Sequence, residues 1–249
     1  SNGPTGSGKT TLLYAMLHEV DRAKCSVMSV EDPVEFQLEG VSQIQVRPHI
    51  GLNFARVLRA VLRQDPDVIM VGEIRDAETL NVCVQVALTG HLVMTSLHAS
   101  TSPGAVRRLM DIGLEAFLIN QTLAAVTTQR LVRRLCDECK QPADPALHSV
   151  PPEARCFIEE HPDATFYEPK GCKKCLEMGY RGRLAIHEIL IPDERVKEVI
   201  FQKGDIGAIR DAALAAGMKP MIVDGLEKAA RGVTSVREVC RVAPRGPNE

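Results

Sequence analysis

The chain has 249 residues, of which 45% are hydrophobic, and its 30 basic and 32 acidic residues give a net charge of −2. This length suits one large domain or one domain with small appendages, and the composition is that of a globular protein with its own core. The near-neutral charge argues against a nucleic-acid-binding protein, which usually presents a basic face, and no run of about 18 apolar residues suggests a membrane span.

The first stretch, Gly3-Pro4-Thr5-Gly6-Ser7-Gly8-Lys9-Thr10, fits the phosphate-loop pattern G-x-x-x-x-G-K-[ST]. Its glycines permit backbone angles at which successive N–H groups converge on one anion. Lys9 is expected beside the β- and γ-phosphates of a nucleotide and Thr10 on Mg²⁺. A helix from Thr10 to about Arg22 would point its positive end at the same phosphates. The alternative is an ordinary glycine-rich turn. The expected nucleotide-binding residues are Gly3, Pro4, Thr5, Gly6, Ser7, Gly8, Lys9, Thr10 and Thr11.

A phosphate loop normally follows a buried strand, and only Ser1 and Asn2 precede this one. We therefore expect the strand that delivers the loop to lie upstream of Ser1. In the sheet, we expect it to pair with the predicted strands Cys25–Val30 or Val68–Val71.

The strand predicted over Cys25–Val30 ends in an acidic stretch that contains Glu31, Asp32 and Glu35. Ligands of open α/β sheets bind outside the carboxyl ends of the strands, so these acids could order Mg²⁺ or a water molecule. A polar turn set by Asp32-Pro33 explains the stretch equally well. A further strand is expected over Gln43–Val46.

A basic helix follows. Asn53 is a plausible N-cap for a helix that continues to about Gln64. Spacings of three and four residues place Arg56, Arg59 and Arg63 on one face of this helix. Such a stripe is usually solvated, and the alternative is a basic edge that reaches the phosphates bound by a neighbouring subunit.

The apolar run Val68–Val71 predicts a strand buried on both faces. Where NTPases of this kind usually carry an Asp at the end of such a strand, this chain has Gly72, followed by Glu73. We assign Glu73 to activation of the attacking water and leave direct Mg²⁺ ligation by it open. A helix is expected over Asp76–Leu88.

Two histidines, His91 and His98, bracket a strand predicted over Leu92–Met94. A histidine on a strand is more often a structural group than a sensor, and this pairing favours a functional role only modestly. Helices are then expected over Ser102–Ile112 and from Ala116 to about Leu123, with Gly113 as the break between them.

Four of the eight cysteines form two C-x-x-C pairs separated by 32 residues. Four thiolates in this arrangement can close a tetrahedral Zn²⁺ site of structural type, and the alternatives are a redox pair or four free thiols. The proline-rich residues 141–170 are expected to form a small exposed lobe, and the remaining cysteines to be ordinary thiols. The expected zinc ligands are Cys136, Cys139, Cys172 and Cys175.

After the second cysteine pair, a turn at Gly179–Arg183 leads into a strand expected over Leu184–Ile191. Short helices are predicted from Asp193 to about Val242, broken at Gly204, Gly217 and Gly232. Apolar residues at helical spacing in this region are expected to be core. They are Val196, Val199, Ile200, Ile222 and Leu226.

These motifs together resemble the C-terminal motor of the type II secretion and type IV pilus assembly ATPases. The likeness runs from residue 3 to about residue 242, and Ala99-Ser100 departs from the Thr-Asn that often follows His98 in the family. The motifs that carry it stand in this order: the phosphate loop, Val30-Glu31-Asp32-Pro33-Val34-Glu35-Phe36, Leu62-Arg63-Gln64-Asp65-Pro66-Asp67, Gly72-Glu73-Ile74-Arg75-Asp76, and Leu88-Thr89-Gly90-His91-Leu92 with Leu97-His98.

The resemblance implies an α/β, RecA-like P-loop NTPase with a mainly parallel central sheet. It would occupy residues 1–135, followed by a tetracysteine zinc-binding lobe at 136–176 and a strand with a C-terminal helical region at 177–249. The family's Asp box would be Glu31 to Glu35, its catalytic glutamate Glu73, and its His box His91 with His98. The basic positions that serve nucleotide or subunit contacts would be Arg59, Arg63, Arg75 and Arg108.

The implied function is an ATP-hydrolysing motor that powers protein secretion or pilus assembly, with ATP, Mg²⁺ and Zn²⁺ as cofactors. The implied partners are further copies in a hexamer, a platform in the inner membrane and cytoplasmic adaptor proteins, but no nucleic acid. The protein would be cytoplasmic and peripheral to the inner membrane. A RecA-like nucleic-acid motor and a non-catalytic ATP-binding scaffold are the alternatives.

Overall fold

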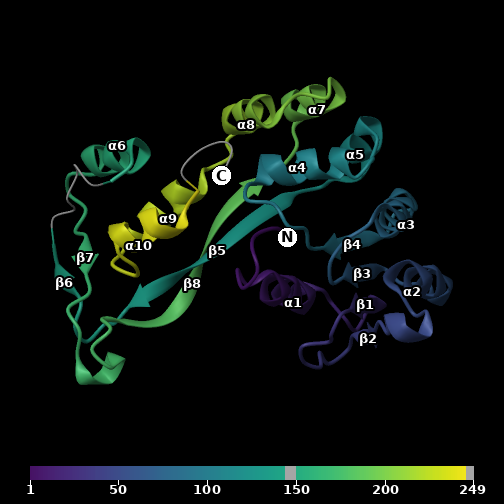
Figure 1. The fold of residues 1–249 in the computed structure, drawn as a ribbon, viewed down its shortest axis with the longest axis horizontal. Coiled ribbons are helices and arrows are strands. Elements are labelled where there is room, and N and C mark those ends of the chain that lie inside the picture. The colour runs from purple at the N-terminus through teal and green to yellow at the C-terminus, as the bar shows by residue number, and fades with distance from the viewer. Residues whose placement is uncertain (144–149, 245–249) are drawn as a thin grey trace.

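A parallel sheet of order β2-β1-β3-β4 carries the N-terminal half of the chain in the computed structural model, which describes residues 1–143 and 150–244 (Figure 1). Its strands are β1 (Val27–Glu31), β2 (Ser42–Gln45), β3 (Val68–Val71) and β4 (Leu92–Thr95). Because all four run in the same direction, their carboxyl ends meet at one edge of the sheet. Every residue of β3 is buried, as its apolar run predicts.

Helices cover both faces of this sheet. Successive side chains of a strand point to opposite faces, so Val68 and Met70 pack on α1 (Lys9–Glu19). Ile69 and Val71 face the other core, which includes residues of α2 (Phe54–Val61) and α3 (Ala77–Leu88). The predicted α/β layering is confirmed.

A long antiparallel ribbon joins this half of the molecule to the other half. It pairs β5 (Val126–Leu135) with β8 (Tyr180–Leu190), and the register is interrupted between Arg133 and Leu135. The strand predicted over Leu184–Ile191 is confirmed as part of β8. The turn predicted over Gly179–Arg183 is wrong from Tyr180 onward, because Tyr180 and Arg183 already pair with Leu135 and Arg133 of β5. No strand was predicted over Val126–Leu135. In Figure 1 the ribbon runs from the phosphate loop toward the cysteine-bearing tip.

Ser1 and Asn2 pair with main-chain groups on both sides. The Ser1 amino group donates to the Thr95 carbonyl at 2.7 Å, and Asn2 N–H donates to the Thr127 carbonyl at 2.7 Å. Asn2 thus bridges the chain just beyond β4 to β5. The predicted pairing with Cys25–Val30 or Val68–Val71 is wrong, because the edges of β1 and β3 are already occupied by β2, by each other and by β4.

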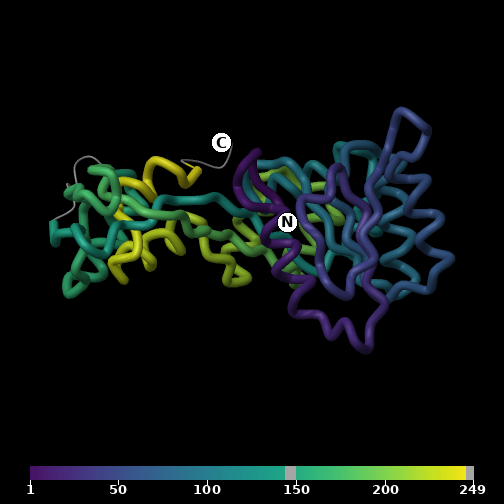
Figure 2. The backbone as a smooth tube through the Cα atoms, turned by 90° about the horizontal axis from the view of Figure 1, so that it is seen from below, coloured from purple at the N-terminus to yellow at the C-terminus, as the bar shows by residue number. Residues whose placement is uncertain are grey.

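The second half of the molecule has its own apolar cluster, which includes Val132 and Ile186 of the ribbon and Phe157, Leu226 and Val239 of the helices. Figure 2 shows this half extending away from the sheet in the side view. The predicted helix breaks at Gly204, Gly217 and Gly232 are confirmed. Besides the ribbon, the elements of this second half are α6 (Pro152–Glu160), β6 (Gln141–Pro142), β7 (Tyr167–Glu168), η4 (Lys173–Cys175), α9 (Met221–Ala230) and α10 (Val236–Val242).

The helices α7 (Glu194–Phe201) and α8 (Ile206–Ala215) return to the first half, where Val196 and Ile200 join the core beneath the sheet. They pack beside α4 (Ser102–Asp111) and α5 (Ala116–Thr122). The short 3-10 turns η1 (Pro48–Ile50) and η2 (Leu62–Gln64) flank α2. Residues 144–149 of the expected lobe lie outside the described residues, and the division into three parts at 135 and 176 stays a prediction.

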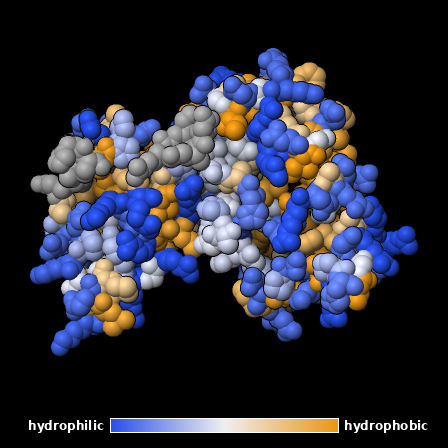
Figure 3. All heavy atoms as spheres, in the orientation of Figure 1, coloured by the Kyte–Doolittle hydropathy of each residue, from blue (hydrophilic) through white to orange (hydrophobic). Residues whose placement is uncertain are grey.

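Hydrophilic side chains cover most of the face seen in Figure 3, with small apolar patches between them. Among the described residues, none of the helices combines the length and the apolar character that crossing a bilayer requires.

Candidate nucleotide site and cysteine cluster

The phosphate loop adopts a backbone that requires glycine at three positions. Gly3, Gly6 and Gly8 have φ values of 143°, 75° and 89°, which residues with a Cβ rarely adopt. A Cβ on Gly3 would stand 2.5 Å from the carbonyl oxygen of Gln129, and one on Gly8 would stand 2.6 Å from Nε2 of the same residue. The loop is therefore packed directly against β5, with no room for side chains on that side.

The helix α1 begins at Lys9 without a side-chain cap at Gly8. The first N–H groups of a helix have no partner within it, and they carry its positive partial charge. Thr10 and Thr11 belong to the first turn of this helix, where Thr10 is half-buried and Thr11 is exposed. A cradle of free N–H groups with this backbone fits a phosphate.

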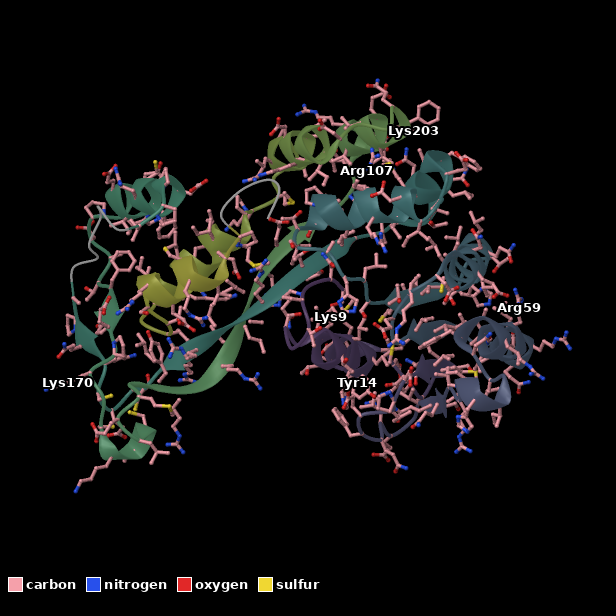
Figure 4. All side chains as sticks on the ribbon, viewed as in Figure 1. Lys9, Tyr14, Arg59, Arg107, Lys170 and Lys203 are labelled. Atoms are coloured by element: carbon pink, nitrogen blue, oxygen red, sulfur yellow. The ribbon has the colours of Figure 1, made fainter. Side chains whose placement is uncertain are left out.

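Lys9 lies across the loop. Its Nζ donates hydrogen bonds to the carbonyl oxygens of Gly3 at 2.8 Å and Pro4 at 3.1 Å. Burial lowers the pKa of Lys9, and the negative charge of Glu73 partly offsets this effect. Figure 4 places Lys9 at the start of α1, between the four-stranded sheet and the ribbon. The ammonium group thus stands between the loop and the end of β3.

Glu73 follows β3 and is held by two side chains. His98 Nε2 lies 3.1 Å from Glu73 Oε2, and the guanidinium of Arg75 pairs with Oε1. Burial disfavours the charged carboxylate, but hydrogen bonds from Arg75 and His98 outweigh it and lower the pKa of Glu73. The carboxylate is therefore ionised, its charge acts on Lys9 of the phosphate loop, and it can accept a hydrogen bond from a water molecule.

The acidic stretch after β1 is divided in the structure. Glu31 is buried, and its carboxylate accepts hydrogen bonds from the Tyr14 hydroxyl, from Ser29 at 2.6 Å and from Gln43 at 3.0 Å. These bonds direct the Glu31 carboxylate at α1 and β2 rather than at Glu73. Asp32 instead lies 3.7 Å from Arg75, so it joins the cluster around Glu73.

Glu35 is exposed beyond this network, and its backbone N–H donates to the Tyr14 hydroxyl at 3.4 Å. The Tyr14 ring in turn packs edge-on against Phe36. The structure therefore brings Asp32 into contact with the Glu73 cluster and gives Glu31 and Glu35 contacts to the side of it.

The two histidines lie at opposite ends of β4. His98 follows the strand and contacts Glu73, as described above. His91 precedes it, and its Nδ1 lies 3.1 Å from the Val86 carbonyl oxygen and 3.0 Å from the Thr89 hydroxyl, at the end of α3. The structure does not bring His91 to Glu73.

The candidate arginines are also dispersed. Arg75 is part of the Glu73 cluster, whereas Arg59 pairs with Glu78 at 2.9 Å on the exposed outer side of α2 and α3. Figure 4 shows Arg59 pointing outward, away from Lys9. Arg63 and Arg108 are exposed, and within the described part of the chain neither forms a hydrogen bond or an ion pair with the loop. The structure therefore brings only Arg75 of these four arginines to the Glu73 cluster.

Two buried polar residues that hold the site together were not predicted from their local sequence. Asn2 donates from Nδ2 to Thr128 at 3.0 Å and accepts from the Ala99 N–H at 2.6 Å, which ties the His98 loop to the start of the phosphate loop. Gln129 donates to the Ser7 carbonyl oxygen at 2.6 Å. No local signal marks either residue, because their partners are distant in the sequence.

The four predicted zinc ligands meet at the tip of the second half. The Sγ atoms of the two C-x-x-C pairs all lie within 4.8 Å of one another. Backbone N–H groups of Cys172 and Gly179 donate to Cys175 Sγ at 3.2 and 3.1 Å. Although burial opposes it, these hydrogen bonds lower the pKa of Cys175 to about 7. Four thiol groups at this spacing fit a tetrahedral metal ion of the zinc type.

Comparison with known families gives a match along nearly the whole chain. The family model described as type II/IV secretion system protein matches residues 2–241. The type II secretion system ATPase E of Vibrio cholerae is 47% identical over 242 residues, which are 96% of this chain and 47% of that protein. The type IV pilus assembly ATPase PilB of Myxococcus xanthus is 43% identical over 237 residues, 95% of this chain and 42% of that protein. The chain spans about half the length of the curated relatives it matches.

Solved structures agree with the sequence matches. The Legionella pneumophila ATPase DotB is similar with a TM-score of 0.65 at 27% identity, over 96% of this chain and 57% of that one. The pilus retraction motor PilT with bound ADP is similar with a TM-score of 0.67 at 25% identity, over 96% of this chain and 59% of that one. The predicted RecA-like α/β fold with a parallel central sheet is confirmed.

Proposed function

The chain belongs to the type II/IV secretion system protein family, and we propose that it is the ATP-hydrolysing part of a motor that powers type II protein secretion or type IV pilus assembly. The observation that carries this proposal is the position of Glu73. Its ionised carboxylate lies at the end of β3, next to a glycine-built phosphate cradle and the Lys9 ammonium. A cradle alone would serve binding, whereas a carboxylate beside it also serves hydrolysis.

In this proposal, residues of the phosphate loop from Gly3 to Thr11 grip the phosphates of ATP. Lys9 exchanges the neutral carbonyl oxygens of Gly3 and Pro4 for charged phosphate oxygens, which are stronger acceptors. Thr10 offers a hydroxyl to Mg²⁺, which when bound would neutralise charge that develops on the β- and γ-phosphates. Asp32 supplies an acidic group beside Glu73, and Glu35 lies to the side of this cluster with its backbone on Tyr14.

Glu73 then orients the attacking water and accepts its proton. His98 and Arg75 hold the two oxygens of the carboxylate and keep it ionised. Arg75 is 60% exposed, so part of its guanidinium remains open to an anionic phosphate while it holds Glu73. Glu31 serves this site at a distance, by fixing the end of β1 through Tyr14 and Ser29.

The cysteine cluster has a structural role in this proposal. With Cys136, Cys139, Cys172 and Cys175 as four ligands, a Zn²⁺ ion has no open position for a substrate. It would fix the tip of the ribbon, where the apolar cluster of the second half does not reach.

We propose further that the intact protein works as a homo-hexamer. Arg59, Arg63 and Arg108 are exposed, so they can serve subunit contacts. His91 lies at the end of α3, with its Nδ1 3.1 Å from the Val86 carbonyl oxygen. The motor would act at the cytoplasmic face of the inner membrane through platform and adaptor proteins rather than through nucleic acid.

Phosphate release from Mg-ATP by the intact protein tests this function. Lys9→Ala is expected to abolish turnover and to weaken ATP binding by at least about tenfold, because the charged partner of the phosphates is lost. Lys24→Ala is the matched control, since Lys24 makes only an exposed pair with Asp21. Equal turnover in all three proteins would contradict the proposal.

A further inference from the structure

Gln129, on β5, is the residue against which the phosphate loop packs. It is 4% exposed, its backbone N–H donates to the Asn2 carbonyl oxygen at 2.9 Å, and its side-chain Nε2 donates to the Ser7 carbonyl oxygen at 2.6 Å. The close approach of Gly3 and Gly8 to the same residue leaves no space for water between the loop and β5. Gln129 therefore contacts the loop at both of its ends, at Gly3 and at Ser7–Gly8.

The bond to Ser7 sets the direction of one peptide plane. The peptide unit is planar and trans, so the Ser7 carbonyl and the Gly8 N–H point in opposite directions. Because the carbonyl points at Gln129, the Gly8 N–H points away from β5, toward the inside of the loop. No acceptor for this N–H is present among the described residues. The side chain of Gln129 thus holds a donor in the position that an anion requires.

A second side chain fixes the orientation of the Gln129 amide. His187, on β8, has its Nε2 2.9 Å from Gln129 Oε1. Since Nε2 of Gln129 donates to a carbonyl, its Oε1 is the acceptor here, and His187 must donate from Nε2. Burial, together with the charge of Lys228, lowers the pKa of His187, so the ring is neutral and carries its proton on this nitrogen. A flipped amide would place two acceptors against each other at Ser7.

The same histidine connects the loop to the C-terminal helices. Its backbone N–H donates to Asp224 Oδ2 at 2.8 Å, and Lys228 of α9 donates to the Ala185 carbonyl oxygen at 2.9 Å. The contacts run without a gap from α9 through β8 and β5 to Ser7. These contacts form one direct link between α9 and the phosphate loop.

We propose that Gln129 is a positioning residue for nucleotide phosphates, which orients the Ser7–Gly8 peptide, and that His187 fixes the Gln129 amide for this purpose. The inference rests on the proposed function, because it requires the loop to bind a nucleotide. A peptide N–H that binds phosphate in both the ground state and the transition state contributes to affinity and not to the rate of the chemical step. Loss of its orientation therefore raises KM and Kd and leaves kcat nearly unchanged.

The test compares Kd for Mg-ADP and the kinetics of Mg-ATP hydrolysis in intact protein. Gln129→Glu replaces the donor at Ser7 by a charged acceptor of the same size, and we expect Kd and KM to rise about tenfold with kcat within about twofold of the unchanged protein. Gln85→Glu is the matched control, because it makes the same change of charge on the exposed side of α3. We expect it to behave like the unchanged protein.

A pair of substitutions at His187 isolates the orienting role from folding. Gln places an amide N–H near the position of His Nε2, whereas Phe keeps the ring and has no donor. We expect His187→Gln to retain the affinity and His187→Phe to lose about threefold.

A merely structural role would lower the active fraction, and hence kcat, with KM unchanged. That pattern in Gln129→Glu, or equal Kd in Gln129→Glu, His187→Phe and the unchanged protein, would overturn the inference. If the unchanged protein bound no Mg-ADP, the proposed function itself would fail, together with the inference that rests on it.

Discussion

The Nε2 atom of His98 lies 3.1 Å from the Oε2 atom of Glu73, across the carboxyl ends of two neighbouring strands. The loop that carries His98 is held by Asn2, whose side chain accepts from the Ala99 N–H. The start of the phosphate loop and the group that orients Glu73 are therefore fixed to each other through one residue. This contact places Glu73, rather than another acid of the chain, at the centre of the chemistry that we propose.

We expect His98→Ala to lower kcat for ATP about tenfold and to leave Kd for ATP unchanged, because His98 orients the carboxylate and does not hold phosphate. Steady-state hydrolysis and equilibrium binding measure the two effects separately. His18→Ala is the control, since His18 is exposed at the end of α1. A His98→Ala protein with normal kcat would show that the contact is not used.

The intact protein is expected to contain one Zn²⁺ per chain when it is purified without added metal. Cys136→Ser should lose the metal and lower the melting temperature by about 5 °C or more, because the metal joins two segments that share little apolar contact. Cys156→Ser should change neither, since Cys156 is exposed and outside the cluster. Elemental analysis and thermal melts give both results, and a metal-free protein with the same stability would refute the assignment.

If the exposed arginines act on the nucleotide site of a neighbouring subunit, two inactive variants should restore activity when they are mixed. Arg63 makes no recorded ion pair among the described residues, and we expect Arg63→Ala to lower turnover while nucleotide binding stays normal. In an equal mixture with Lys9→Ala, about a quarter of the interfaces of a hexamer would combine an intact loop with an intact arginine. Turnover should then exceed that of either protein alone. A mixture that only averages the two activities would exclude a shared site, and Arg107→Ala serves as the control.

Stability in acid should depend on Glu238, which is 1% exposed and joins α10 to β5. Burial disfavours its charge, but hydrogen bonds from Arg241 and Arg133 lower the pKa of Glu238 to about 2. In the unfolded chain the carboxyl group titrates near its ordinary value of 4.5. The stabilisation is therefore present above about pH 4.5 and is lost as the pH falls from there toward 2.

Urea denaturation at pH 5 and pH 3 measures this effect. From pH 5 to pH 3 we expect the free energy of unfolding of the native protein to fall by about 1–2 kcal/mol more than that of Glu238→Gln. This range is reduced for screening by solvent, because Arg133 and Arg241 are partly exposed. Any loss of metal is common to both proteins and cancels in the comparison. Glu194→Gln, at an exposed position of α7, should behave like the native protein.

The elements that the sequence predicted well are those with local causes. The buried run Val68–Val71 forms β3 as expected, and the Asn53 side chain caps α2 by accepting from the Arg56 N–H. The strand β5 was missed because it contains Thr127, Thr128 and Gln129, whose polar groups suggest a loop. Asn2 and Ser102 bond to the Thr128 hydroxyl and the Ser7 carbonyl accepts from the Gln129 amide, and all three partners are distant in the sequence.

The motifs predicted which residues belong to the candidate site, but not how these residues are placed relative to one another. Residues two apart on a strand share a face, so Glu31 lies on the side of Ser29 and bonds to it, away from Glu73. The histidines flank the four residues of β4, and this length separates them. Distances of this kind follow from strand direction and register, which a motif in one segment does not contain.

Glu73→Gln in the intact protein tests the central claim most directly, because it removes the proton acceptor and keeps the size of the side chain and the phosphate grip. Phosphate release and equilibrium ATP binding are measured beside Glu39→Gln, an exposed control. We predict that Glu73→Gln binds Mg-ATP with the affinity of the unchanged protein and lowers its hydrolysis by at least about a hundredfold. Hydrolysis at the normal rate would contradict the account.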